Sequence, residues 1–278
     1  MSDPGTAAAS APATRLVLIG AGGRMGAQIL RQLSQTPMLR LTGAVASQRS
    51  GALGCDAGVQ AGIHETGVPL SATLPPLLGE ADVAVDFSTA AAAAANLAAC
   101  AAAGVPLLIG TTGLPQDLQA PLAAAARRIA LLVAPNTSLG VNVLVELVRR
   151  VAQALPHSFD IEVLETHHRH KRDAPSGTAL ALAGAAAQGR GQSLAEQACF
   201  SRPQHGGERA DGQIGFAVVR GGDVVGEHQV LFLGDGERVS LGHAVTDRAV
   251  FARGALLAAR WLARQPPGQY RMVDVLFS

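Results

Sequence analysis

Residues 16–26 read Leu-Val-Leu-Ile-Gly-Ala-Gly-Gly-Arg-Met-Gly, an apolar run that leads directly into a glycine-rich turn. The apolar run predicts a buried strand, and the residues after the turn predict a helix from about Gly23 to Ser34. Glycine permits a tight turn and lets the backbone approach a pyrophosphate, which then binds helical N–H groups at the positive end of the helix dipole. This stretch therefore predicts the first strand, turn and helix of a dinucleotide-binding fold.

The spacing of the glycines fits GxxGxxG through Gly20, Gly23 and Gly26, and not GxGxxG. A turn of this kind can also be no more than a tight connection between a strand and a helix. A second predicted strand, Leu39 to Ala46, follows some twenty residues on and favours the nucleotide interpretation. The first cofactor-binding candidates are Gly20, Ala21, Gly22, Gly23, Arg24 and Met25.

The end of the second strand indicates which nucleotide binds. An acidic residue there would accept hydrogen bonds from the adenosine ribose and repel a 2′-phosphate, but the sequence is Ala46-Ser-Gln-Arg-Ser50. Ser47 and Gln48 can donate hydrogen bonds, and Arg49 can bind a phosphate. We therefore expect NADPH as the preferred cofactor, with NADH as the alternative. The competing interpretation of Arg49 is a solvated loop residue.

Short apolar runs alternate with Ala- and Leu-rich helical stretches from Arg15 to about Asn136. This alternation predicts an α/β fold, a Rossmann-like doubly wound parallel sheet, with later strands at 83–87, 105–109 and 129–133. Ligands of such sheets bind at the carboxyl ends of the strands, which supply the remaining cofactor-binding candidates. These are Phe87, Gly110, Thr111, Thr112, Ala134, Pro135, Asn136 and Thr137.

After Asn136 the pattern changes to that of a second, α+β domain with a β-rich sheet. We expect helices at 139–154, 177–188 and 247–264, strands at 159–164 and 238–244, and a loop over 189–213. Two β-rich runs, 214–220 and 223–233, flank Gly221-Gly222, which predicts that they pair as a hairpin. The predicted division is a disordered tail (1–13), a dinucleotide-binding domain (14–138), the second domain (139–246) and a return to the first domain (247–278).

The densest polar cluster runs from Glu165 to Thr178 and contains Lys171, the only lysine among 22 Lys and Arg residues. Arginine supplies a solvated positive charge equally well, so a single lysine indicates a position where arginine fails. An ammonium is compact and has transferable protons, whereas a guanidinium is a planar fork that stays protonated. Lys171 is therefore interpreted as a group for proton chemistry or tight anion binding. The alternative is a surface lysine left by chance.

Pro175-Ser-Gly-Thr178 precedes a predicted Ala/Leu helix, so the N–H groups of Gly177 and Thr178 can form a cradle for an anion such as a carboxylate. We expect substrate contacts from His168, Ser176, Gly177 and Thr178. Histidine exchanges protons near neutral pH, and His167 lies at the end of the preceding strand. The catalytic candidates are therefore His167 and Lys171.

A metal site formed by Glu165, His167, His168 and His170 is the competing interpretation of this cluster. Adjacent residues on a strand or loop point in divergent directions, and the spacing matches no helix-borne zinc pattern, so we expect no metal. The other histidines are isolated in the sequence and receive no role. They are His64, His157, His205, His228 and His243.

The composition excludes several classes of partner. A formal charge of +1 and the lack of a basic tract argue against nucleic acid, and no apolar run approaches the ~20 residues of a membrane span. Residues 1–13 lack the cationic start and apolar core of an export signal. The three cysteines show no CxxC spacing and predict neither a disulfide framework nor a zinc-thiolate site. We expect a cytoplasmic protein with a small-molecule ligand.

The chain resembles the 4-hydroxy-tetrahydrodipicolinate reductase (dihydrodipicolinate reductase) family. The family signature E-[IV]-x-E-x-H-x-x-x-K-x-D-x-P-S-G-T-A matches at every fixed position from Glu162 to Ala179. Further matches are the GAGGRMG turn, DFST, GTTG, the APN segment and the segments around 214–228. The resemblance implies NAD(P)H-dependent reduction of 4-hydroxy-tetrahydrodipicolinate to tetrahydrodipicolinate, with loss of water, in lysine and diaminopimelate biosynthesis.

The resemblance also implies residue roles and an assembly. It makes His167 the catalytic acid and Lys171 a second proton donor, and it implies domain closure over the substrate and a homotetramer built through the β-rich domain. Two departures are Ser47, where some members have an acidic residue, and Thr137, where a larger side chain is usual. The rival functions are reduction of a different imine or carbonyl substrate and NADP(H) sensing without catalysis.

Overall fold

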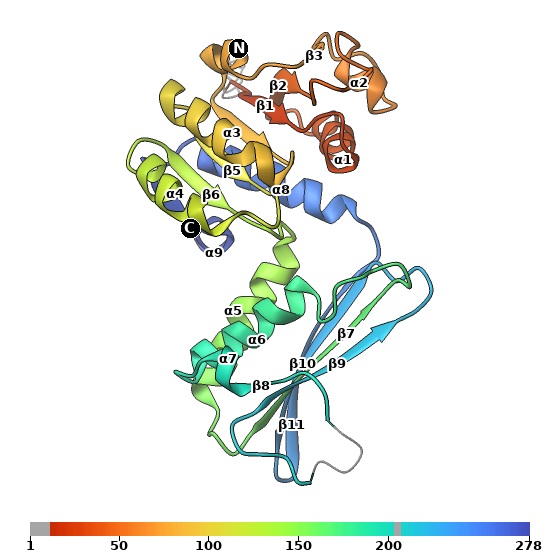
Figure 1. The fold of residues 1–278 in the computed structure, drawn as a ribbon, viewed down its shortest axis with the longest axis vertical. Coiled ribbons are helices and arrows are strands. Elements are labelled where there is room, and N and C mark those ends of the chain that lie inside the picture. The colour runs from red at the N-terminus through yellow and green to blue at the C-terminus, as the bar shows by residue number, and fades with distance from the viewer. Residues whose placement is uncertain (1–11, 203–206) are drawn as a thin grey trace, which may run out of the picture. The chain divides into compact units, whose positions relative to one another are not determined.

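The computed structural model describes residues 12–202 and 207–278, so the predicted disordered tail, 1–13, lies outside the described residues apart from its last two. Of these described residues, those up to Pro135 pack with Ala255–Arg271 as one compact unit. Those of Asn136–Gly254 form another with Met272–Ser278. Each unit has its own sheet (Figure 1).

The first unit holds a seven-stranded, wholly parallel sheet. Its strands are β1 (Thr14–Ile19), β2 (Leu39–Val45), β3 (Leu70–Ser71), β4 (Val83–Asp86), β5 (Leu107–Ile109), β6 (Ala130–Val133) and β12 (Gly268–Tyr270). Their order is β12-β6-β5-β4-β1-β2-β3, so the chain starts in the middle and winds outward in both directions. The predicted Rossmann-like doubly wound fold is confirmed.

The helices of this unit are α1 (Arg24–Leu33), α2 (Ala57–Gln60), α3 (Ala90–Ala103), α4 (Gln119–Ala126) and the 3₁₀ turns η1 (Pro75–Glu80) and η2 (Gln116–Leu118). Helix α8 (Ala249–Leu262) runs from the second unit into the first. Leu97 of α3 and Leu122 of α4 share a buried core with Val17, Ile19 and Leu107 of the sheet. Alanine-rich helices can pack closely against such a sheet because the alanine side chain is a single methyl group, which is small enough to let the helix backbone approach the strands.

The second unit holds a five-stranded mixed sheet in the order β11-β10-β7-β9-β8. Its strands are β7 (Asp160–His167), β8 (Ala198–Cys199), β9 (Ile214–Arg220), β10 (Gly226–Gly234) and β11 (Glu237–Val245). Its helices are α5 (Leu139–Ala154), α6 (Gly177–Gly189), α7 (Leu194–Gln197) and α9 (Met272–Leu276). Ile161, Val163, Val230 and Phe232 pack with α5 and α6 in one core.

The predicted hairpin around Gly221-Gly222 is wrong. Strand β7 lies between the two runs, parallel to β9 on one side and antiparallel to β10 on the other. The link from β9 to β10 passes the end of β7, where Gly221 N donates to His167 O and Arg169 N donates to Gly222 O. Gly222 has φ of +53°, so the glycine pair serves a turn, although the turn spans a third strand. The predicted loop over 189–213 also contains α7 and β8.

Candidate functional site

The turn between β1 and α1 is packed so closely that two of its glycines have no room for a side chain. Gly20 has φ of +86°, and a Cβ on it would lie 2.6 Å from Phe87 O. A Cβ on Gly26 would lie 2.3 Å from Gly20 O. Gly23 precedes α1 and provides no side-chain cap, so the first N–H groups of the helix remain available for a phosphate.

A cavity of about 490 Å³ opens beside this turn at the carboxyl ends of β1, β2 and β4. The predicted cofactor residues that line it are Gly20, Gly22, Gly23, Ser47, Gln48, Arg49 and Phe87. Ser88, Thr89 and Asn96 also line it. The Arg49 side chain is exposed, and the backbone N–H of Arg49 donates to Ser47 Oγ at 3.2 Å. The glycine turn, with the free N–H groups at the start of α1, and the positive charge of Arg49 at the cavity rim fit the phosphates of a dinucleotide.

Other predicted cofactor residues in the first unit are not among those lining this cavity. They are Ala21, Arg24, Met25, Gly110, Thr111, Thr112, Ala134 and Pro135. Gly110 lies against the ring of Phe87, because a Cβ on Gly110 would come within 2.2 Å of Phe87 Cζ. Its lack of a side chain thus makes room for an aromatic ring that does line the cavity.

Asn136 and Thr137 belong to the second unit. Asn136 Nδ2 donates to Thr178 Oγ1 at 3.1 Å, and Asn136 Oδ1 accepts from Ser138 N. Thr137 is buried, and its hydroxyl donates to Phe251 O at 2.7 Å. The structure therefore connects a predicted cofactor residue, Asn136, directly to a predicted substrate residue, Thr178.

His167 is held by a buried carboxylate. Its Nδ1 lies 2.5 Å from Glu165 Oε2, and the Glu165 side chain is 0% exposed. Arg220 donates to both oxygens of Glu165 at 2.7 Å, and Ser176 N donates to Oε1 at 2.9 Å. Burial raises the pKa of the Glu165 carboxyl, but the hydrogen bonds from Arg220, His167 and Ser176 outweigh it and hold that pKa below its ordinary value.

The structure brings His228, which received no role in the sequence analysis, against His167. The two rings meet edge to face with centroids 5.0 Å apart, and His228 Nε2 lies 3.0 Å from Ser176 Oγ. His228 pairs with Glu165 across β10 and β7. This pairing explains why the ring of His228 meets that of His167, which lies 61 positions earlier in the sequence. The available signal was the alternation in β7, which puts Glu165 and His167 on the apolar face of the strand, where a carboxylate needs partners.

We expect His228 to weaken the fold in mild acid. Burial first, and then the charge of His167, lowers the pKa of His228 to about 4, whereas an unfolded chain has a histidine pKa of about 6.5. As pH falls from about 6.5 toward 4, the unfolded chain binds a proton here that the folded protein does not, so the free energy of unfolding falls by up to about 1.4 kcal/mol per pH unit.

Urea unfolding at a series of pH values measures this loss. His228→Gln should lose less stability than the wild type across that interval, while His157→Gln, at an exposed position, should follow the wild type. If the free energy of unfolding depends on pH equally in all three proteins, His228 does not cause the loss of stability in mild acid.

Helix α6 presents free amides beside this cluster. Ser176 is its N-cap: Ser176 Oγ accepts from Ala179 N at 3.1 Å, and Leu180 N donates to Ser176 O. Ser176 is buried and its polar atoms are engaged. The N–H groups of Gly177 and Thr178, at the first two positions of the helix, are left without a partner among the described residues. They carry the positive end of the helix dipole and suit a carboxylate.

Lys171 and His168 lie in the segment between β7 and α6. Lys171 Nζ lies 2.8 Å from Asp173 Oδ2, and the lysine side chain is 21% exposed. His168 Nδ1 is buried without a hydrogen-bond partner among the described residues. Burial, and then the charge of Arg248, lowers the pKa of His168 and favours its neutral form. A neutral imidazole with an unused nitrogen can still contact a carboxylate by donating its N–H.

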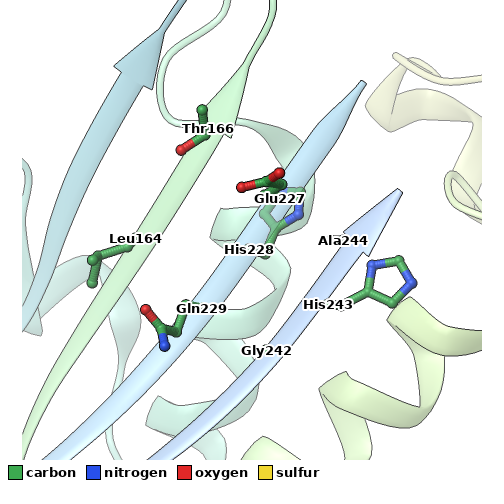
Figure 2. Close-up of a pocket in the computed structure, with 8 residues that line it drawn as sticks. All are labelled: Leu164, Thr166, Glu227, His228, Gln229, Gly242, His243 and Ala244. Carbon is green, nitrogen blue, oxygen red and sulfur yellow. The ribbon is translucent and has the colours of Figure 1, made fainter. Parts of the chain in front are cut away.

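A shallow depression of about 500 Å³ lies on the sheet of the second unit, between β7, β10 and β11 (Figure 2). Leu164, Thr166, Glu227 and Gln229 contribute side chains, and the other lining residues are His228, Gly242, His243 and Ala244. The side chain of His243 points away from it toward α5, where a Cβ on Gly140 would lie 2.6 Å from His243 Nε2. None of the predicted catalytic or substrate residues lines this depression.

Within the described residues, no group of three or more His, Cys, Asp or Glu side chains is arranged to hold a metal ion. In the same part of the chain, no helix has both the length and the apolarity that a bilayer span requires.

Two family models match consecutive parts of the chain: dihydrodipicolinate reductase N-terminus over residues 14–137 and C-terminus over residues 140–276. The 4-hydroxy-tetrahydrodipicolinate reductase of Anaeromyxobacter dehalogenans strain 2CP-1 is 49% identical over 95% of this chain and 97% of its own length. The chain belongs to the dihydrodipicolinate reductase family. The resemblance found in the sequence is thereby confirmed. A relative of the same name from Rhodopseudomonas palustris strain BisB18 is 48% identical over 94% of this chain and 97% of its own.

The fold of this family member is also that of solved structures. Dipicolinate-bound dihydrodipicolinate reductase from Paenisporosarcina sp. TG-14 aligns with a TM-score of 0.75 at 23% identity, over 93% of this chain and 97% of that one. Amine dehydrogenase from Mycobacterium smegmatis aligns with a TM-score of 0.60 at 16% identity, over 94% and 95%. At these identities the likeness concerns the fold alone.

Proposed function

We propose that this chain reduces 4-hydroxy-tetrahydrodipicolinate to tetrahydrodipicolinate, with loss of water, in lysine and diaminopimelate biosynthesis. The names of its nearly full-length relatives support this substrate. The observation that carries the proposal is that one unit contains three groups: His167, which is hydrogen-bonded to Glu165; Lys171; and the free amides of α6. A ring with two carboxylates and a nitrogen needs an anion cradle, a cation and a proton donor.

Each residue has a distinct task in this proposal. The amides of Gly177 and Thr178 bind one carboxylate, and neutral His168 contacts it. Loss of the 4-hydroxyl leaves a conjugated imine, and negative charge develops toward the ring nitrogen as the ring is reduced. The ammonium of Lys171 stabilises that charge, and His167 delivers the proton that completes the reduction. A reduced nicotinamide nucleotide, when bound, supplies the hydride.

We propose NADPH as the preferred nucleotide, with NADH accepted less well. The support is local: the cavity beside the glycine turn has Arg49 on its rim and no acidic residue from the end of β2. The glycine turn and the open start of α1 would bind the pyrophosphate, and Ser47, Gln48 and Arg49 would bind the adenosine 2′-phosphate.

Steady-state reduction of freshly generated cyclic imine, with each nucleotide in turn, tests both proposals. We expect substrate-dependent loss of nucleotide absorbance, with kcat/KM higher for NADPH. A marked preference for other imines or carbonyls would assign a different reductase activity. Binding of NADPH without any substrate-dependent oxidation would favour a nucleotide sensor instead.

We also propose a homotetramer assembled through the face of the second sheet that α5 and α6 leave open. Cross-strand rows on this face combine Ala217, Leu164 and Gln229, and beside them Val219, Thr166 and Glu227. Val219 is 54% exposed, an apolar exposure that assembly would remove. Light scattering on a sizing column should give a mass about four times the chain mass of 28.3 kDa, whereas a mass of one chain would contradict the proposal.

The cytoplasm is the proposed location of this reaction. The three cysteines are unpaired, and free thiols of this kind are usual in a reducing compartment.

A further inference from the structure

The buried carboxylate of Glu165 has more partners than burial of one acidic side chain requires. It accepts four hydrogen bonds, two from Arg220, one from Ser176 N and one from His167 Nδ1. An unpaired buried carboxylate is strongly unfavourable, and the bidentate Arg220 alone would satisfy much of that need. The remaining two bonds go to a proposed proton donor and to the residue that starts the substrate-binding helix.

The bond to His167 determines which ring nitrogen is available for chemistry. An ionised carboxylate can only accept hydrogen bonds, so His167 Nδ1 must carry a hydrogen in both the neutral and the protonated imidazole. Nε2 is then the atom that gains and loses the proton. A Cβ on Gly226 would lie 2.9 Å from Nε2, so the glycine leaves room beside that nitrogen.

The other bonds connect the same carboxylate to the rest of the proposed substrate site. Ser176 N, bound to Oε1, belongs to the cap of α6, whose next two amides are free. Arg220 Nη2 also donates to Asp173 O at 2.7 Å, and the Asp173 carboxylate holds Lys171 Nζ at 2.8 Å. One buried ion pair therefore ties together the imidazole, the lysine segment and the anion cradle.

We propose that Glu165 is the positioning residue of the proton-transfer site. It holds His167 in the Nδ1–H tautomer with Nε2 directed to the reacting atom, and through Arg220 and Ser176 it keeps that imidazole in register with the amides of α6. The proposal rests on the proposed reductase function for its kinetic consequence, but the tautomer is a property of the protein alone.

Glu165→Gln tests the tautomer. The amide is nearly isosteric, but its NH₂ group can donate to His167 Nδ1, which would transfer the ring hydrogen to Nε2. Imidazole ¹⁵N chemical shifts in histidine-labelled protein distinguish the two tautomers. We expect Nδ1–H for His167 in the wild type and a shift toward Nε2–H in Glu165→Gln. An Nε2–H tautomer in the wild type would overturn the proposal without any activity measurement.

The kinetic test uses the same variant in the reductase assay. We expect kcat to fall about thirtyfold, as for other residues that orient a reacting group, while KM changes less than about threefold. Glu165→Asp, which keeps the charge on a shorter side chain, should recover part of kcat. Glu162→Gln is the matched control, because Glu162 lies on the same strand and pairs with Arg202, and it should retain wild-type kcat. Retention of wild-type kcat by Glu165→Gln would contradict the proposal.

Loss of folding is a separate outcome, since Glu165→Gln leaves the charge of Arg220 without its partner. The double variant Glu165→Gln with Arg220→Met removes that charge, and circular dichroism shows whether it folds. A folded double variant should remain slow, whereas full recovery of kcat would assign Glu165 a purely structural role. Failure of the wild type to reduce the cyclic imine would instead refute the proposed function and leave the tautomer result standing.

Discussion

Lys171→Arg should lower kcat about a hundredfold while the protein folds normally. The guanidinium keeps the positive charge and can still pair with Asp173, which now holds Lys171 Nζ at 2.8 Å. It spreads that charge over a planar fork and does not give up a proton, so it is a poor substitute for an ammonium in proton transfer. Steady-state kinetics and thermal unfolding of the purified variant measure the two effects.

The neighbouring exposed Arg172 offers the reciprocal control. Arg172→Lys makes the same exchange in the opposite direction one residue away and should leave kcat and unfolding unchanged. If Lys171→Arg turns over at nearly the wild-type rate, the single lysine of the chain has no special chemical role, and the interpretation based on its rarity is wrong.

Arg49→Ala should weaken NADPH binding about thirtyfold and change NADH binding less than about twofold. Arg49 is exposed on the rim of the cavity beside the glycine turn, and a charge-assisted bond to the 2′-phosphate is worth roughly 1.5–3 kcal/mol. NADH lacks that phosphate, so its binding should depend little on Arg49. Fluorescence titration of each nucleotide gives the two dissociation constants.

Arg40→Ala controls for the loss of one positive charge. Arg40 is exposed on β2, the strand that precedes the turn holding Arg49, but it does not line the cavity, so its removal should affect neither nucleotide. Equal losses for NADPH and NADH in Arg49→Ala would show that Arg49 does not read the 2′-phosphate.

The fold of the first unit could be predicted because its signals are local. The apolar run at residues 16–19, the glycine turn and the following helix each depend on neighbours in the sequence, and the alternation of strands and helices implies a parallel sheet. The hairpin around Gly221-Gly222 failed for the opposite reason. A glycine pair indicates that the chain changes direction there. It does not indicate that β7 lies between β9 and β10, which depends on the core that Ile161 and Val163 share with Phe216 and Phe232.

The same limit applies to the candidate site. His167, Lys171 and the start of α6 lie within twelve residues and stand out in the sequence as one polar cluster. Arg220 and His228 come from β9 and β10, 55 and 63 residues after Glu165, and reach it only through strand pairing. A histidine that looks isolated in the sequence is therefore the ring packed against the proposed proton donor.

The central position of β7 has a consequence for biosynthesis of the chain. Arg220 is made 55 residues after Glu165, an interval of several seconds at roughly 5–20 residues per second on the ribosome. During that time β7 has neither of its neighbouring strands, and its glutamate has no guanidinium to offset desolvation. A nascent chain that ends before Ile214 can pack β7 against α5 and α6 but has no strand to pair with either of its edges, so the second sheet forms only after β9 and β10 have emerged.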